Sequence, residues 1–287
     1  MRHATRHLAL ILACVTAACR ASHPSEPKSP MDPHYKSEGP WFEGWYTRIV
    51  DDKAQVDVAA IVGSFVRRGV KFEESAKEGY AALVISDRAK GTSVTYESFP
   101  AKTMLEAGGE PVRGNPDEKA PADFAWRADG IGYMTESALD LKLSSTVHIK
   151  AEFGKPEPLF PGRPWIGPEG AAANLPFIWS HWFVYSTGSE TKYQLTTDSG
   201  SRSGSGVSHM EKNYGSAFPG GWVWLHAMTE GGDNRLSVAG GPAPVPVIQP
   251  EVWSVSFKTK ILDWVFLPGV KDITVKRESD PCNGKFT

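Results

Sequence analysis

Alternation of apolar and polar residues with a period of two runs through most of this 287-residue chain, and helical periodicity is nearly absent. Segments rich in β-branched and aromatic residues, such as 55–66 and 139–153, are separated by turn sequences such as DRAKG and EGGDN. The 28 glycines and 22 prolines suit many turns better than long helices. Because short, evenly spaced strands are typical of sandwiches and barrels, the pattern predicts an all-β, antiparallel fold with little helix.

One segment, GKPEPLFPGRPWIGPEGAAANLP at 154–176, interrupts this alternation. We interpret it as a Pro/Gly-rich connection between two β-barrel halves, the first at 35–153 and the second at 177–287. The alternative is a long functional loop that closes a single barrel.

The N-terminus has the features of an export signal. Arg2 and Arg6 precede the apolar stretch LALILACVTAA, which is too short to span a bilayer and is followed by small residues. The sequence therefore predicts a signal segment at 1–21 and a polar, Pro-rich tether at 22–34. The tetrapeptide that ends at Cys19 resembles a bacterial lipoprotein box, which implies lipidation of Cys19 and membrane anchoring. Plain secretion after cleavage behind Ala21 is the alternative.

Composition bounds the partners and cofactors. A net charge of −2 and scattered basic residues give no electrostatic basis for binding nucleic acid. The three cysteines are Cys14, Cys19 and Cys282, and two of them lie in the signal segment, so a disulfide framework is excluded. The histidines are too dispersed for a metal motif, and we expect neither a metal nor a cofactor. The sequence does not indicate an oligomeric state.

The stretch VSHMEKNYGSAFPGGWVWLH, at 207–226, places ionisable groups among aromatic rings. In a strand, His209, Glu211 and Asn213 share one face, and Lys212 lies on the other. If Glu211 faces inward, away from Lys212, desolvation raises its pKa and makes it a usable proton donor near neutral pH. The alternative is a pair of surface groups beside a structural turn.

A second cluster, PWFEGWYTRIV at 40–50, raises the same question. Glu43 lies between Trp41 and Trp45 on one face of the expected strand, where it is partly desolvated. Arg48 is its nearest counter-charge along the chain, and the alternative to a catalytic role is a structural ion pair at a barrel end.

Together the two clusters carry a family likeness. FEGWY at 42–46 and HMEKNYG…FPGGWVWLH at 209–226 resemble the paired motifs of the tocopherol cyclase-like family, and the likeness extends roughly over 38–240. Tyr214 stands where the family usually has Trp, and the chain ends soon after a predicted strand at 273–277. The resemblance implies two lipocalin-like β-barrel halves, as in related carotenoid-hydratase-like proteins, and a lipophilic prenyl-type ligand.

The resemblance also implies a reaction: acid-catalysed ring closure of a prenylated quinol. An acid protonates the alkene, and the phenol oxygen captures the tertiary cation in a dry, aromatic cavity. Glu211 or Glu43 is the expected proton donor. The expected ligand-binding residues are Trp41, Trp45, Tyr46, His209, Asn213, Tyr214, Trp222, Trp224 and His226. The alternatives are a non-catalytic lipid-binding protein and a structural protein of the cell envelope.

Overall fold

The computed structural model of the chain is almost entirely antiparallel β-sheet. It describes residues 29–34, 38–71, 78–107, 124–174, 178–218, 220–242 and 251–269. Within these ranges the only helices are two short 3-10 turns, η2 (Gly170–Asn174) and η3 (Glu230–Gly232). Neither is long and apolar enough to cross a bilayer. The predicted all-β antiparallel class is confirmed.

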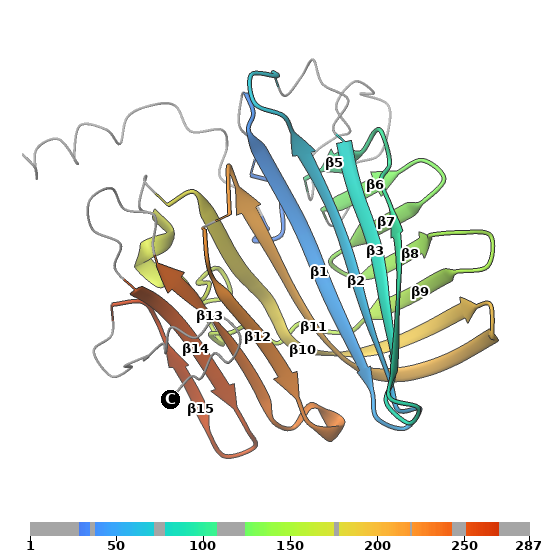
Figure 1. Cartoon of the computed structure of the whole chain (residues 1–287). Coiled ribbons are helices and arrows are strands. Elements are labelled where there is room, and N and C mark those ends of the chain that lie inside the picture. Colours follow the sequence, from blue (N-terminus) through green and yellow to red (C-terminus); the bar gives the residue numbers. More distant parts are fainter. Residues whose placement is uncertain are drawn as a thin grey trace, which may run out of the picture.

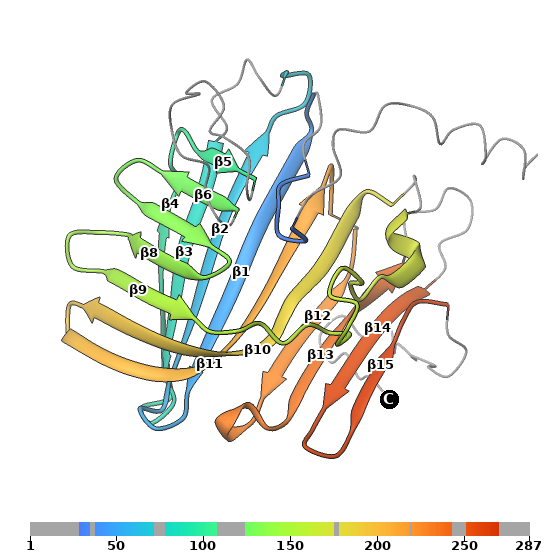
Figure 2. The same ribbon diagram turned by 180° about the vertical axis from the view of Figure 1, so that it is seen from behind.

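A large sheet of eleven strands dominates the molecule, in the order β4-β3-β2-β1-β11-β10-β9-β8-β7-β6-β5. The sheet curls into a half-barrel, so that β5–β9 stand opposite β1–β3 (Figures 1 and 2). The strands are β1 (Trp41–Asp51), β2 (Val56–Val66), β3 (Glu78–Asp87), β4 (Thr92–Ser98), β5 (Met104–Glu106), β6 (Ala125–Ala128), β7 (Gly132–Thr135), β8 (Ala138–Lys142), β9 (His148–Phe153), β10 (Ser180–Thr197) and β11 (Gly200–Gly215).

Side chains fill the interior of this curled sheet. Every second residue along most of β1 and all of β2 is buried, as the alternation in the sequence predicts. Trp45 stacks on Phe124 across the interior, with ring centroids 5.0 Å apart. The buried Trp126 donates a hydrogen bond from Nε1 to the carbonyl oxygen of Gly63 at 3.0 Å. The large sheet therefore encloses a packed core.

A small sheet covers the outer face of β10 and β11 (Figures 1 and 2). Trp182 and Val184 on β10 pack there against Ala239 and Trp224 of the small sheet. The middle of β11 is thus covered from both sides. The strands of the small sheet, in order, are β12 (Val223–Met228), β13 (Arg235–Pro242), β14 (Glu251–Lys258) and β15 (Asp263–Phe266).

The two sheets are not divided where the sequence predicted. Residues 154–176 join β9 to β10, and these strands pair within the large sheet. The change of sheet instead falls between Gly215, the end of β11, and Val223, the start of β12. The connection does not end the large sheet, because β10 pairs with β11 over its whole length and its C-terminal part also pairs with β9. Trp182 and Val184, near the start of β10, pack against the small sheet.

The N-terminal prediction is tested only in part. The signal segment with Cys19 and residues 22–28 lie outside the described residues, as does the strand expected at 273–277. Residues 29–34, predicted to belong to the tether, are instead packed into the large sheet. Met31 is buried, and its carbonyl oxygen accepts a hydrogen bond from Nε1 of Trp45 at 3.0 Å.

Candidate functional site

Strand β11 presents side chains to two buried faces. Five consecutive residues, 208–212, are buried, because the core of the large sheet lies on one side and the small sheet on the other. Glu211 and Lys212 therefore point in opposite directions, and both are out of water. Glu43, on the neighbouring strand β1, is also buried. Neither of the two predicted acids is a free surface group.

The first face, here called the ion-pair face, surrounds Lys212. Its Nζ donates to Oε1 of Glu43 at 2.8 Å and to the carbonyl oxygen of Asp32 at 2.6 Å. Nδ1 of His34 lies 3.1 Å from the same nitrogen. Glu43 accepts a further hydrogen bond from the backbone N–H of His34 at 2.6 Å. The side chains of Lys212 and Glu43 are both completely buried, so this is a closed ion pair.

The charges on this face do not suit a proton donor. Burial raises the pKa of Glu43, but the Lys212 charge and the His34 contacts outweigh it, so the pKa lies below its ordinary value. Glu43 is therefore ionised at neutral pH, and its expected role as an acid catalyst is not supported. Its counter-charge is Lys212 and not Arg48, because Arg48 lies on the other face and pairs with Asp57 at 2.8 Å.

Three expected ligand-binding residues belong to the packing of the ion-pair face. Trp41 donates from Nε1 to the carbonyl oxygen of His34 at 2.8 Å, and Trp45 stacks in the core. Tyr214 lies flat against the His34 ring, with centroids 3.8 Å apart. These residues lie on the opposite side of the sheet from Glu211, so they do not line a common cavity with it.

The second face, here called the glutamate face, carries Glu211 toward the small sheet. Its Oε2 accepts hydrogen bonds from Nε1 of Trp182 at 2.9 Å and lies 2.8 Å from Nε2 of His209. The His209 ring stacks on His226 of β12, with centroids 4.0 Å apart. Strand register places Tyr46 directly across from Glu211. The glutamate and its imidazole partner thus lie between two sheets among aromatic rings.

Two titratable neighbours of this pair, His226 and Tyr46, are neutral near physiological pH. Burial lowers the pKa of His226 to about 2, with the charges of His209 and Arg48 acting in the same direction. Burial likewise raises the pKa of Tyr46 above its ordinary value. The guanidinium of Arg48 donates to the carbonyl oxygen of His226 at 3.1 Å, which fixes this histidine beside His209.

Three buried polar atoms of the glutamate face have no hydrogen-bond partner within the described part of the chain: Nδ1 of His209, Nε2 of His226 and Nε1 of Trp224. The Trp224 ring also meets the Tyr46 ring edge to face, with centroids 5.3 Å apart. Buried polar atoms are nearly always paired, so three such atoms around stacked rings mark a place where a polar group of a guest could bind.

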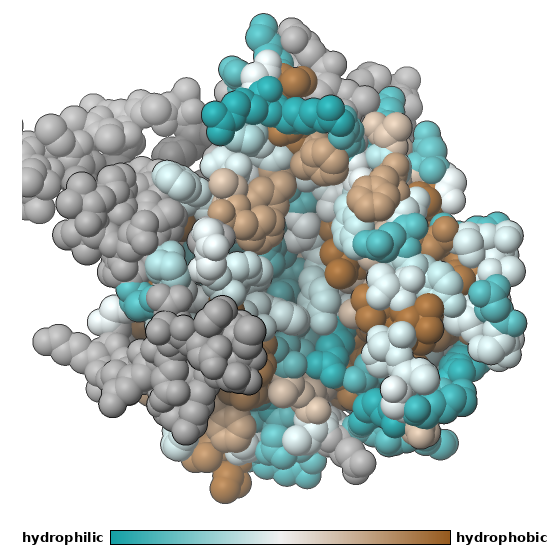
Figure 3. Space-filling model, viewed as in Figure 1, coloured by the Kyte–Doolittle hydropathy of each residue, from teal (hydrophilic) through white to brown (hydrophobic). Residues whose placement is uncertain are grey.

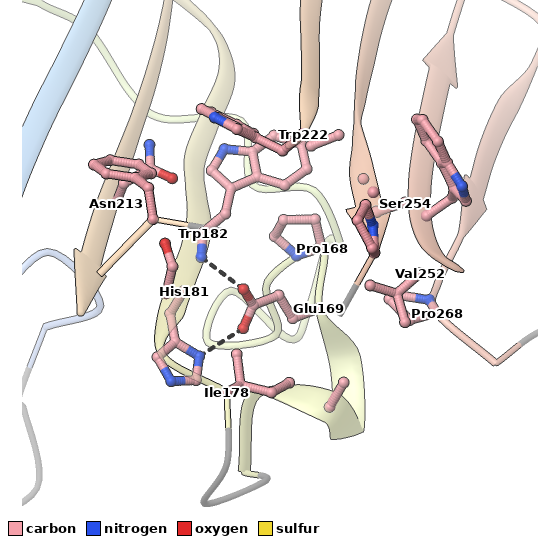
Figure 4. A pocket seen from close by; sticks show the side chains of 18 of the residues that line it. Pro168, Glu169, Ile178, His181, Trp182, Asn213, Trp222, Val252, Ser254 and Pro268 are labelled. Carbon is pink, nitrogen blue, oxygen red and sulfur yellow. Dashed lines mark hydrogen bonds and ion pairs between the residues drawn. The ribbon is translucent and has the colours of Figure 1, made fainter. Parts of the chain in front are cut away.

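A cavity of about 140 Å³ adjoins this cluster, between the β10–β11 hairpin and the small sheet. Figure 4 shows Trp182, Asn213 and Trp222 around it. The indole of Trp182 lines the cavity, and its Nε1 donates to Glu211, so this ring separates the cavity from the acid. Glu169 fixes the Trp182 backbone by accepting its N–H at 2.7 Å. A volume of this size accommodates a single aromatic ring.

The expected site residues thus divide between the two faces. Glu211, His209 and Tyr46 meet on the glutamate face, with Trp224 and His226 opposite them on β12. The sequence analysis missed Trp182 and Glu169. Only the pairing of β10 with β11 brings Trp182 within reach of Glu211. Across the described ranges, no group of three or more histidine, cysteine or acidic side chains could hold a metal.

On the face seen in Figure 3, hydrophobic residues form separate groups among hydrophilic ones, wherever the residues are coloured. The candidate site is therefore the interior of the glutamate face and the cavity beside it.

Comparison with known proteins relates the chain to others by fold alone. No family model and no curated protein matches its sequence. The structure is similar to a crystal structure from Nitrosomonas europaea that bears the name AttH, with a TM-score of 0.51 and 12% identity over 91% of this chain and 78% of that one. This likeness supports the lipocalin-like class of the fold.

Two further solved structures are similar to this one with lower TM-scores. Kievitone hydratase from Nectria haematococca gives a TM-score of 0.43 and 12% identity over 85% of this chain and 71% of the other. CghA gives a TM-score of 0.46 and 10% identity over 81% of this chain and 65% of the other.

Proposed function

We propose that this protein binds a lipophilic small molecule between β11 and the small sheet, and that Glu211 acts on it as an acid with His209 as its partner. One observation carries the proposal: a buried carboxyl–imidazole pair adjoins three buried polar atoms that have no partner among the described residues. A closed structural network would satisfy these atoms, whereas a binding site leaves donors and acceptors for its ligand.

The reaction that best fits these groups is ring closure of a prenylated quinol, as the sequence resemblance implies. Protonated Glu211 gives its proton to the alkene, which becomes a tertiary cation. The rings of Trp182, Trp224 and Tyr46 supply π-faces for this charge. The phenol oxygen then forms the new C–O bond, and its proton passes through His209 back to Glu211. The product is an isomer of the substrate, so no co-reactant is consumed.

The size of the cavity restricts how such a substrate is held. About 140 Å³ accepts the quinol ring but not a prenyl chain, which must leave past the rim at Trp222. Trp182 lies between this cavity and the acid, so the indole must turn aside before a bound alkene can meet Glu211. We propose that substrate binding displaces the Trp182–Glu211 hydrogen bond and thereby frees the acid.

A second candidate is a lipid-binding protein without catalysis. The residues that line the cavity favour it, because they are mostly apolar and do not include Glu211. In this case the rings hold the ligand, and the Glu211–His209 pair only fixes β10 against β11.

The test is incubation of the purified protein with prenylated quinols, followed by chromatography and mass spectrometry. Ring closure leaves the mass unchanged and shifts the retention time, whereas binding alone changes neither after extraction. Glu211→Gln keeps the shape of the side chain and removes its titratable proton. We expect this variant to fold and bind the quinol but to lose turnover by roughly 100-fold or more.

Glu190→Gln is the matched control, because Glu190 is an exposed acid on β10 and does not line the cavity. It should leave turnover unchanged. Equal turnover in wild type and Glu211→Gln would exclude Glu211 as the acid. Quinol binding without product in the wild type would select the lipid-binding candidate.

A further inference from the structure

A second pocket, of about 740 Å³, opens beside η2, and residues of the ion-pair face form part of its wall. His34 and Tyr214 form one part of it, and the apolar side chains of Trp165, Ile166 and Phe183 form another. The volume lies within the range of small-molecule sites and is several times that of the cavity on the glutamate face. Glu169 and Trp182 line both pockets, but the proposed reaction places its substrate only in the smaller one.

Hydrogen bonding on the ion-pair face determines what His34 offers to this pocket. A protonated Lys212 has three N–H donors, and three acceptors surround it: Oε1 of Glu43, the carbonyl oxygen of Asp32 and Nδ1 of His34. Nδ1 of His34 also lies 3.2 Å from Oε1 of Glu43, but that oxygen already accepts from Lys212 at the shorter distance of 2.8 Å. Because a protonated Lys212 can only donate, we assign Nδ1 as the acceptor, which places the proton of the neutral ring on Nε2. Burial lowers the pKa of His34, so the ring stays neutral at physiological pH.

The ring is also held in place. His34 lies parallel to Tyr214 at 3.8 Å and 6°, and Tyr214 in turn stacks on His181 at 4.9 Å. Nδ1 points to the buried ion pair, while about 31% of the side chain is exposed. The edge that carries the Nε2 proton is the part left to line the pocket. Because this donor is already fixed in place, the protein does not have to reorganise it when a ligand binds.

We propose that this pocket is a second ligand site, which takes a planar, uncharged carbonyl compound whose oxygen accepts a hydrogen bond from Nε2 of His34. The indole of Trp165 and the ring of Phe183 supply apolar surface for the plane of the ligand. An anion is disfavoured, because the carboxylate of Glu169 lines the same wall and the Lys212 charge is already neutralised by Glu43. The proposal does not depend on catalysis by Glu211.

The experiment is calorimetric titration of the full chain with two probes. Dimethylnaphthoquinone is planar, has two carbonyl oxygens, and cannot add to thiols when its quinone-ring positions are methylated. Dimethylnaphthalene has nearly the same shape without an acceptor. We expect the quinone to bind roughly 3- to 10-fold more tightly, which is the effect of one hydrogen bond. Trp165→Ala should weaken both probes by at least about threefold.

Trp222→Ala is the matched control, because Trp222 is also an exposed indole but lies at the rim of the other cavity. It should leave both affinities unchanged. A loss with Trp222→Ala and none with Trp165→Ala would place the probes in the smaller cavity and overturn the proposal. Equal affinities for the two probes, or no binding of the quinone, would also overturn it.

His34→Phe tests the donor itself, since it keeps a ring against Tyr214 and removes the Nε2 proton. It should abolish the preference for the quinone. If this variant does not fold, because Lys212 loses an acceptor, nitrogen chemical shifts of His34 in the wild type decide the point. A proton on Nδ1 instead of Nε2 would contradict the proposal.

Discussion

The polar clusters around Lys212 and around Glu211, on opposite faces of β11, differ in how completely their polar groups are satisfied. Outside these clusters, the Thr47 hydroxyl on the Lys212 side is also buried without a partner among the described residues. On the ion-pair face, each of the three donors of Lys212 meets an acceptor, and the carboxylate of Glu43 receives the charge. On the glutamate face, three buried polar atoms around the Glu211–His209 pair have no partner among the described residues. A saturated network stabilises a fold, whereas an unsaturated one leaves groups for a ligand.

Adjacent residues of one motif therefore have different roles. Glu211 and Lys212 are neighbours in the sequence, but the alternation of a strand sends one to the small sheet and the other to the core of the large sheet. The two glutamates that the motifs bring together, Glu43 and Glu211, are likewise separated by the sheet. A motif match alone cannot tell these roles apart.

The largest expected effect is loss of the buried ion pair. Glu43→Gln leaves the Lys212 ammonium without its counter-charge, so we expect the free energy of unfolding to fall by about 3–5 kcal/mol. Urea denaturation at pH 7 measures this loss. The double variant Glu43→Leu/Lys212→Met removes both charges and should recover much of the stability. A loss below about 1 kcal/mol in the single variant would show that the pair is not closed.

Glu211→Gln is the comparison for that experiment, because it makes the same substitution at the buried glutamate of the other face. The amide oxygen can still accept from Nε1 of Trp182, so we expect a loss of only about 1 kcal/mol. If the two Gln variants lost the same free energy of unfolding, the ion-pair face would not contribute more to stability than the glutamate face.

The next largest expected effect is the loss of stability at acid pH. Because the pKa of His226 is about 2 in the folded chain and about 6.5 in the unfolded chain, the unfolded state binds a proton first as the pH falls. His226 therefore has little effect on the free energy of unfolding above pH 6.5, and it lowers that free energy progressively as the pH falls below 6.5. We expect it to lower the free energy of unfolding by about 2 kcal/mol between pH 7 and pH 5.

His226→Phe isolates this contribution, since it keeps a ring against His209 and cannot titrate. His34, whose pKa is also lowered, acts in the same direction in both proteins and cancels in the comparison. Urea denaturation at the two pH values should show a smaller acid-induced loss in the variant. Parallel losses would mean that His226 can take up a proton within the fold.

The sequence could predict the strands and the faces, but not the partners. Alternation predicted that His209, Glu211 and Asn213 share a face, but it left open whether Glu211 faces inward, and the structure buries both glutamates. The ion pair of Glu43 depends on the register of β1 against β11, which places Trp45 opposite Lys212. No local pattern specifies that register, so the nearest charge along the chain, Arg48, was the wrong choice.

Two other differences have similar causes. Residues 29–34 were expected in the tether because their composition is polar and Pro-rich, yet side chains of β1 and β11 bind their backbone. The break at 154–176 looked like a boundary between halves, but β10 continues the large sheet beyond it. Both arise from long-range pairing, which composition does not record.

The smallest expected effect is a difference in stability between two tryptophan variants on the glutamate face, one at an indole whose N–H is hydrogen-bonded and one at an indole whose N–H is not. Trp182 donates from Nε1 to Glu211 at 2.9 Å, whereas the buried Nε1 of Trp224 finds no acceptor in the described ranges. Trp182→Phe and Trp224→Phe remove the same volume and the same N–H, so their difference reports the hydrogen bond. We expect Trp182→Phe to lower the free energy of unfolding by about 1–2 kcal/mol more than Trp224→Phe.

Urea denaturation of both variants at pH 7 measures this difference, and quinol binding supplies the complementary readout. Trp224→Phe should reduce the free energy of quinol binding more than the free energy of unfolding, because the bound ligand is the only acceptor that we propose for the Trp224 N–H. If the two variants were equally destabilised and Trp224→Phe bound the quinol as wild type does, the unpaired atoms of the glutamate face would not belong to a binding site. The contrast between the two faces of β11 would then concern stability alone.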